Sequence, residues 1–132
     1  MVTTDHKPVL IVIAGPNGSG KTTITTQILH HEWMENAIGF FFVATNHPSI
    51  NASRIARRVM KGGHDVPITK VISRYYKSIL NCKRVSSLVD RTYIYDNSVD
   101  DQEARLLFRM VDGKVFKQYV KELPNWVHTI IP

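Results

Sequence analysis

Residues 15–22 match the pattern G-x-x-x-x-G-K-[ST] in full, and this match constrains the fold more than any other feature of the chain. The apolar run Pro8–Ala14 precedes it, as expected of a buried parallel strand. The segment from Thr22 to about Trp33 follows it, with Ile24 and Ile28 on one face of a predicted helix. Strand, glycine-rich loop and helix in this order are the context in which the pattern forms a phosphate-binding loop.

The chemistry of such a loop assigns roles to its residues. Glycines let backbone N–H groups turn toward a polyphosphate, and the helix N-terminus adds partial positive charge. Lys21 is expected to reach the β- and γ-phosphates, and the Thr22 hydroxyl to bind Mg²⁺. The expected cofactors are therefore ATP or GTP with Mg²⁺. The loop residues expected to bind the nucleotide are Gly15, Pro16, Asn17, Gly18, Ser19, Gly20, Lys21, Thr22 and Thr23.

Length and composition favour a single domain over residues 1–132. Cys82 is the only cysteine, which excludes an internal disulfide and a C-x-x-C metal site. Residues 1–8 are polar, and no apolar run approaches the roughly 20 residues of a membrane span. We therefore expect a cytoplasmic protein with no signal peptide and no membrane partner.

The net charge of +6 is concentrated in one segment. Residues 54–84 hold nine Lys/Arg and one acid, Asp65, a balance of +8, whereas the other eight Lys/Arg and ten acids leave −2. A basic block indicates a phosphate-rich partner, either a nucleoside triphosphate or a nucleic acid, or else a solvated helix face.

Apolar periodicity places this block on two helices. One is predicted from about Ile50 to Lys61, with Ser49 as its N-cap and Gly62-Gly63 at its end. The next is predicted from Pro67 to about Cys82, with Asp65 favoured as its cap. Together they form a basic helical hairpin of the kind that closes over a triphosphate.

Each predicted helix has an apolar stripe that we expect to be buried. The stripe of the first helix consists of Ala52, Ile55, Ala56 and Val59. The stripe of the second helix consists of Ile68, Val71, Ile72, Tyr75 and Ile79. Tyr76 follows Tyr75 directly, so it is expected to be partly exposed.

The strand pattern predicts the α/β class, with a small, mainly parallel sheet in a three-layer core and a C-terminal β-hairpin. The predicted strands are Pro8–Ala14, Phe40–Thr45, Thr92–Tyr95, Leu106–Val111 and Lys114–Val120. Asp112-Gly113 between the last two is a strong hairpin signal, and residues 122–132 are expected to be irregular. So few strands leave an exposed sheet edge, which favours a homo-oligomer or a bound partner.

Several motifs together resemble those of the zeta-toxin-like kinases. The matching segments are Ile13–Thr23, Arg57–Val59, Gly62–Pro67, Ser73–Tyr76, Tyr95–Ser98 and Leu107–Arg109. They occur in the family's order over most of residues 8–127. The resemblance implies a P-loop NTPase core like that of adenylate kinase, and transfer of the γ-phosphate of ATP or GTP to a hydroxyl. In toxin members the acceptor is UDP-N-acetylglucosamine, and an antitoxin is a partner of such proteins.

The resemblance also implies roles for residues outside the loop. Arg58 and Arg74 match the arginines that stabilise the transferring phosphoryl group, with Arg57 as a close competitor of Arg58, so Lys21, Arg58 and Arg74 are the candidate catalytic residues. Asn97 would lie near the base of the nucleotide and is a further candidate for cofactor binding. The alternative for Asp96-Asn97-Ser98 is an ordinary turn.

The chain departs from the family before Phe40. The family has a long stretch here, with an Asn-Ala-Asp type motif whose acid acts as a base and a strand ending in an acid that helps to bind Mg²⁺. Only about ten residues occupy this place in our chain, and neither motif is present. Three hypotheses follow: an active kinase with a small-molecule acceptor, a degenerate relative that binds a nucleotide or a partner without turnover, and a nucleic-acid binder. The absence of any known nucleic-acid motif disfavours the last.

Overall fold

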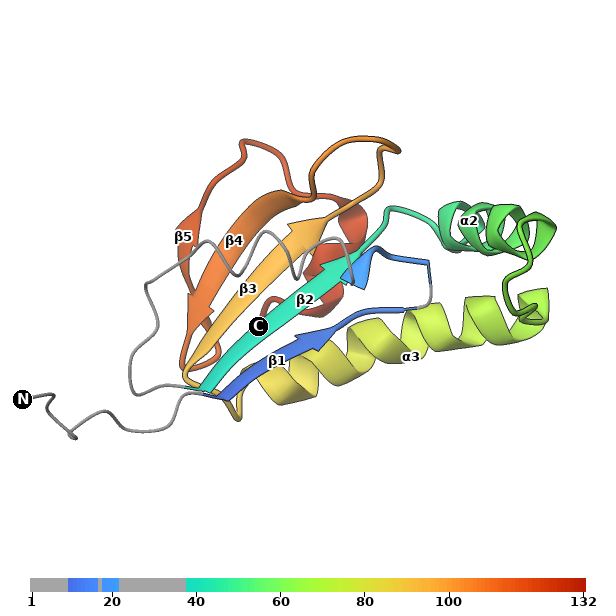
Figure 1. Cartoon of the computed structure of the whole chain (residues 1–132). Helices are drawn as coiled ribbons and strands as arrows, with labels where there is room; N and C mark the ends of the chain where they lie inside the picture. The colour runs from blue at the N-terminus through green and yellow to red at the C-terminus, as the bar shows by residue number, and fades with distance from the viewer. Residues whose placement is uncertain (1–9, 17, 22–37) are drawn as a thin grey trace, which may run out of the picture.

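The structure is a computed structural model, and it describes residues 10–16, 18–21 and 38–132. Figure 1 shows an α/β arrangement in which helices lie beside a twisted sheet of five strands. The strands are β1 (Leu10–Ala14), β2 (Ile38–Ala44), β3 (Arg91–Asp96), β4 (Arg105–Val111) and β5 (Lys114–Gln118). The helices are α2 (Pro48–Met60), α3 (Ile68–Ser86) and the short 3-10 helix η1 (Asn125–Thr129).

The sheet is open and mixed, with the strand order β1-β2-β3-β4-β5. β1, β2 and β3 are parallel, whereas β4 and β5 are added in antiparallel fashion. Asp112 and Gly113 join β4 to β5 with positive φ angles of 51° and 78°, as the predicted two-residue turn requires. The three parallel strands end at one edge of the sheet, where α/β proteins place their ligands.

The side chains of β2 alternate between two apolar clusters, one on each face of the sheet. Phe40 and Phe42 belong to the cluster that packs against α3. Phe41 and Val43 belong to the opposite cluster, where Phe41 stacks on Tyr93 with 4.8 Å between ring centroids. Burial on both faces explains why β2 is a continuous apolar run and not an alternating one.

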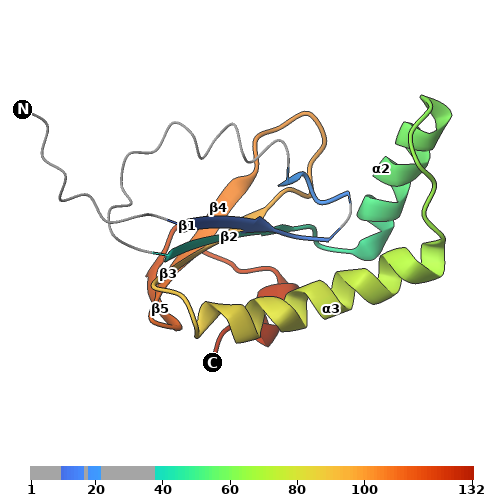
Figure 2. The same cartoon turned by 60° about the horizontal axis from the view of Figure 1, so that its bottom comes forward.

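One face of the sheet is covered by α3 and η1 (Figure 2). Tyr75, Ile79 and Cys82 of α3 and Val127 of η1 are buried in the cluster on this face. The predicted helix from Thr22 to about Trp33 lies outside the described residues. Within the described residues, no helix is long and apolar enough to cross a membrane.

The tail is more ordered than the sequence predicted. Residues 122–132 were expected to be irregular, but they include η1, and Trp126, Val127 and Ile130 are buried. The burial of large apolar side chains against α3 stabilises this short helix although its length gives it little stability of its own.

The predicted caps of both helices were wrong. His47, and not Ser49, is the N-cap of α2, because its Nδ1 accepts a hydrogen bond from the Ser49 N–H over 3.0 Å. Asp65 does not cap α3, which starts after Pro67 without a side-chain cap and continues to Ser86. The proline fixes the φ angle at the helix start in place of a polar cap.

The predicted apolar stripes are only partly buried. In α2, Ile55 is buried and Ala56 is exposed, and in α3, Ile68 and Ile72 are exposed although Val71 is buried. α3 packs on the sheet through the line of Val71, Tyr75 and Ile79, and a residue one position farther along lies about 100° around the helix. Ile72 therefore faces away from the core. Tyr76 is exposed, as predicted.

Candidate functional site

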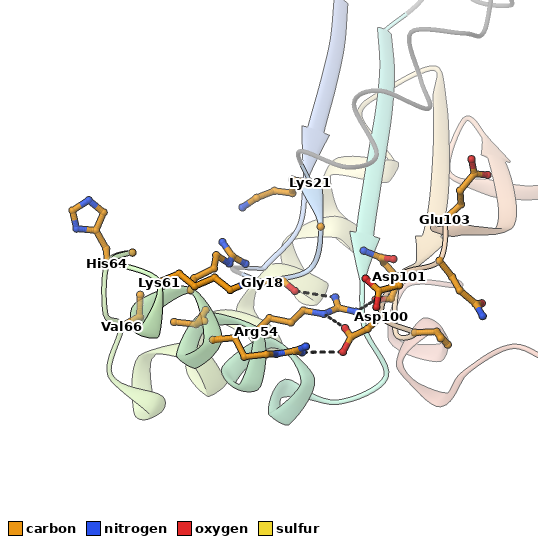
Figure 3. A pocket seen from close by; sticks show the side chains of 17 residues that line it. Gly18, Lys21, Arg54, Lys61, His64, Val66, Asp100, Asp101 and Glu103 are labelled. Atoms are coloured by element: carbon orange, nitrogen blue, oxygen red, sulfur yellow. Dashed lines mark hydrogen bonds and ion pairs between the residues drawn. The ribbon is translucent and has the colours of Figure 1, made fainter.

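A cavity of about 1100 Å³ lies at the carboxyl ends of the parallel strands (Figure 3). Its walls come from the loop after β1, from α2, from the connection between α2 and α3, and from residues 97–103 after β3. The parallel topology brings these segments together, so Gly18 and Glu103 line the same cavity although 85 positions separate them in the sequence.

The loop after β1 follows a tight path that requires glycine at two positions. Gly20 has a φ of +99°, and a Cβ atom there would collide with the amide nitrogen of Asn97. A Cβ atom on Gly15 would collide with the carbonyl oxygen of Val43 in β2. The loop is therefore packed against β2 and the end of β3 with no room for side chains at these positions.

Asn97 holds this loop in place from the end of β3. Its side-chain Nδ2 donates to the carbonyl oxygen of Ser19 over 3.0 Å, and its backbone N–H donates to the carbonyl oxygen of Ala44 over 2.9 Å. The Ser19 N–H in turn donates to the carbonyl oxygen of Pro16, and both residues are buried. The Ser19 Oγ is buried without a hydrogen-bond partner in the described part of the chain.

Arg54 of α2 ties three segments of the cavity wall together. Its Nη1 donates to the carbonyl oxygen of Gly18 over 3.0 Å, and its Nη2 donates to the carbonyl oxygen of Asn97 over 2.6 Å. Its Nε donates to a carboxylate oxygen of Asp100 over 3.0 Å. The side chain is only 13% exposed, so these bonds satisfy a charge that is largely removed from water.

Asp100 is shared between two arginines of α2. Besides Arg54, it accepts a hydrogen bond from Arg57 Nη2 over 2.9 Å. The hydrogen bonds from Arg57 and Arg54 lower the pKa of the Asp100 carboxyl below its usual value. Asp100 and Arg57 are both about half exposed, so this second ion pair contributes little to stability.

Positive charge gathers on the opposite side of the cavity. Lys21 Nζ donates to the carbonyl oxygen of Gly15 over 2.8 Å, and partial burial together with the charge of Arg58 lowers the pKa of Lys21. Arg58 and Lys61 line the same cavity, and neither forms an ion pair with any residue that the structure describes. Figure 3 shows Lys21 and Lys61 across the cavity from Glu103. A bound anion would relieve the repulsion among these cations.

The structure brings together most of the predicted site residues that it describes. Gly18, Gly20, Lys21, Arg58 and Asn97 line the cavity. The remaining described loop residues, Gly15, Pro16 and Ser19, lie behind them, bonded or packed against the lining residues. Asn17, Thr22 and Thr23 are outside the described residues, and the metal-binding role of Thr22 stays a prediction with them.

Arg74 is placed differently. It is exposed on α3 and is not among the residues that line the cavity. Its catalytic role stays a prediction from the resemblance alone.

The acidic residues near the cavity come from the segment after β3. Asp100, Asp101 and Glu103 line the cavity, whereas Asp96 does not. Asp96 is buried, where it accepts a hydrogen bond from Ser98 Oγ over 2.6 Å and lies 3.8 Å from an Arg105 nitrogen. Among the described residues, no group of three His, Cys, Asp or Glu side chains could hold a metal ion.

Sequence reasoning did not identify the positioning role of Arg54. The basic block contains this residue, but its partners Gly18, Asn97 and Asp100 are 36 to 46 positions away. No local pattern signals such a contact, which depends on the parallel order of β1, β2 and β3.

Comparisons of the chain with protein-family models, with curated proteins and with solved structures found no significant match.

Proposed function

We propose that this chain binds a nucleoside triphosphate, ATP or GTP, with its polyphosphate on residues 15–22 and its terminal phosphates facing Lys21 and Arg58. The single observation that carries the proposal is the pairing of a glycine-constrained loop with crowded cations. Lys21 and Arg58 share one cavity closely enough for the charge of Arg58 to lower the pKa of Lys21. A dense anion is the ligand that such an arrangement favours.

The resemblance to zeta-toxin-like kinases is part of the same proposal. A P-loop core would have its phosphate loop after the first parallel strand and its arginines on the following helices, which agrees with the position of the loop after β1 and of Arg58 on α2. Under this proposal the Thr22 hydroxyl would hold Mg²⁺, which would neutralise charge on the phosphates. Asn97 would act through the loop that it holds and not only through the base.

The test is a thermal unfolding experiment with ATP–Mg²⁺ and with GTP–Mg²⁺. A ligand at a hundredfold excess over its Kd adds about 2.7 kcal/mol to the free energy of unfolding, which raises the midpoint temperature by several degrees. We expect this shift in the wild type and its loss in Lys21→Ala. Lys114→Ala is the matched control, because Lys114 is an exposed lysine of β5 that does not line the cavity. Absence of a shift with both nucleotides in the wild type would refute the proposal.

Phosphoryl transfer is a second and separate step. It requires a carboxylate near the acceptor hydroxyl or the metal ion. Of the carboxylates that line the cavity in the described residues, Asp100 is already bonded to Arg54 and Arg57, which leaves Asp101 and Glu103. We therefore propose nucleotide binding as the function of the chain. Transfer of the γ-phosphate to a small-molecule hydroxyl is a further function, which measured turnover would establish.

Incubation with labelled ATP and UDP-sugars separates the two functions. Label in the sugar that disappears in both Lys21→Ala and Arg58→Ala would establish a kinase. Unchanged ATP after prolonged incubation, together with a thermal shift, would establish a binding protein without turnover. Displacement of the bound nucleotide by RNA or DNA in a salt-dependent manner would instead favour the nucleic-acid hypothesis.

A further inference from the structure

A second surface of the molecule is unlike an ordinary solvated helix face. Four large apolar side chains follow one another at intervals of four residues on α3, and we call them the α3 stripe. Their exposed fractions are 65% for Ile68, 42% for Ile72, 54% for Tyr76 and 50% for Leu80. Single exposed apolar residues are common, whereas a contiguous row of them marks an interaction site.

The α3 stripe ends at a depression between α3 and η1. A cavity of about 210 Å³ is lined by Tyr76, Ile79, Leu80, Trp126 and Thr129. Trp126 is held by a hydrogen bond from its Nε1 to Asn46 Oδ1 over 3.3 Å and by packing against Phe42. Figure 2 shows α3 along the outside of the molecule. The four side chains of the stripe are exposed on it.

The charge beside the stripe indicates the chemistry of that partner. α3 has no acidic residue. Of its five exposed cations, Lys77, Lys83 and Arg84 lie beside the C-terminal half of the stripe, whereas Lys70 and Arg74 lie on the opposite side of the helix. A second copy of α3 would place two sets of like charges together, which disfavours self-association through this face. A bilayer would contact the exposed side chains of the stripe but would leave the concave depression beside Trp126 unfilled, whereas a partner helix can insert a side chain into it.

We infer that the α3 stripe binds an amphipathic helix of another protein, whose apolar side chains pack on the stripe and whose acidic side chains face Lys77, Lys83 and Arg84. The stripe extends about 18 Å from Ile68 to Leu80, enough for more than three turns of a partner helix. One apolar side chain of the partner fills the depression between Leu80 and Trp126. This surface is separate from the proposed nucleotide site, since none of the described residues lines both cavities.

The experiment uses a synthetic helical peptide of 18 residues, with leucines spaced alternately three and four residues apart and glutamate at all other positions. A peptide with lysine in place of every glutamate is the matched probe. Binding is followed by tryptophan fluorescence in a Trp33→Phe background, in which Trp126 is the only tryptophan. We expect a fluorescence change with the acidic peptide that weakens as salt is added, and none with the lysine peptide.

Variants locate the binding to the stripe. Leu80→Ala and Ile72→Ala should each weaken binding of the acidic peptide at least about tenfold, because each removes a side chain that the partner would bury. Leu88→Ala is the control, since Leu88 is an exposed leucine beyond the end of α3, and it should bind as the wild type does. The thermal shift with ATP–Mg²⁺ should be the same in all three variants, so failure of this inference is distinguishable from failure of the proposed function.

Three results would overturn the inference. The first is equal binding of the two peptides, or no binding of the acidic one. The second is a dimer in sedimentation experiments that Leu80→Ala dissolves, which would make a second copy the occupant. The third is binding to phosphatidylglycerol vesicles that depends on Leu80 while the acidic peptide does not bind, which would make the surface a membrane contact.

Discussion

β2 and β5 both contain phenylalanine, but their side chains have opposite environments in the fold. All six residues from Gly39 to Ala44 in β2 are buried, whereas all five residues of β5 are exposed. β2 lies between two parallel strands and carries α2 at its carboxyl end, while β5 pairs with β4 alone at the edge of the sheet. The interior strand β2, with its continuous apolar run, supports the candidate site, whereas the edge strand β5, with Val115 and Phe116 as its apolar residues, does not.

The largest expected difference is between two phenylalanines. Phe42 of β2 is 1% exposed and Phe116 of β5 is 64% exposed. We expect Phe42→Ala to lower the free energy of unfolding by about 3–5 kcal/mol through the cavity that it creates, and Phe116→Ala to lower it by less than about 1 kcal/mol. Urea unfolding measures both values, and similar losses in the two variants would contradict the comparison.

Two glycines extend the comparison to the loops beside these strands. Gly15 lies against the carbonyl oxygen of Val43 in β2, and Gly113 forms the turn before β5. Gly15→Ala should lower the free energy of unfolding by about 2–3 kcal/mol and abolish the thermal shift with ATP–Mg²⁺, because the phosphate loop must move.

Gly113→Ala provides the matched control. Its φ of +78° makes an alanine strained by about 1–2 kcal/mol, but the turn does not line the candidate site. The unfolding midpoint of this variant should be lower than that of the wild type. ATP–Mg²⁺ should nevertheless raise it by as many degrees as it raises the midpoint of the wild type. Loss of the shift in both variants would mean that global destabilisation, and not loop position, controls binding.

Arg54 and Arg57 test how α2, the helix that follows β2, supports the candidate site. Arg54 bonds to three segments, whereas Arg57 is 53% exposed and, within the described part of the chain, bonds to Asp100 alone. Arg54→Met should lower the free energy of unfolding by about 2 kcal/mol, since it leaves carbonyl oxygens in the cavity wall without donors. Arg57→Met should lower it by less than about 1 kcal/mol. Nucleotide affinity should fall in Arg54→Met although this side chain bonds to the loop and not to the ligand.

The smallest effect concerns a hydroxyl beneath the end of β2. Tyr75 Oη donates to the carbonyl oxygen of Thr45 over 2.5 Å, so Tyr75→Phe should cost about 1 kcal/mol. Burial is the main cause that raises the pKa of Tyr75 to about 12, and the neighbouring Tyr76 and Asp96 contribute less. The raised pKa favours the protonated folded state, so its contribution is complete below pH 10 and is lost as the pH rises through 12.

Unfolding experiments between pH 9 and pH 12 check this sign. The wild type should lose stability over the upper part of this range, and Tyr75→Phe should lose less. The remaining loss is expected to come in part from Tyr95 of β3, because burial raises its pKa to about 12 as well. An equal loss in both proteins would show that Tyr75 is not protected in the folded state.

Local patterns predicted the strands, both long helices and the β4–β5 turn from the sequence. The apolar run of β2 and the Asp112-Gly113 pair are signals within a few residues, and both were confirmed. The exposure of Ile68 and Ile72 was not predictable in this way, because it depends on which line of α3 meets the sheet. η1 depends likewise on the burial of Trp126 against distant residues.

The candidate site was predictable to the extent that its residues belong to one motif. Gly18, Gly20 and Lys21 come from a contiguous pattern, and Arg58 came from the family resemblance. The contacts of Arg54 with Gly18 and Asn97 arise only when β1 and β3 flank β2 in parallel. Asp100 is in an exposed loop whose role becomes visible only through the two arginines that it bonds.

The place of β1 at the edge of the sheet has a dynamic consequence. Among the described strands, β1 bonds to β2 alone, and it carries the loop that starts at Gly15. Hydrogen exchange should therefore show β1 opening at a lower free energy than β2 or β3, without unfolding of the whole chain. A ligand held by the loop would slow exchange in β1 most, so the protection of a few amides between Leu10 and Ala14 would report occupancy of a cavity that lies beyond them.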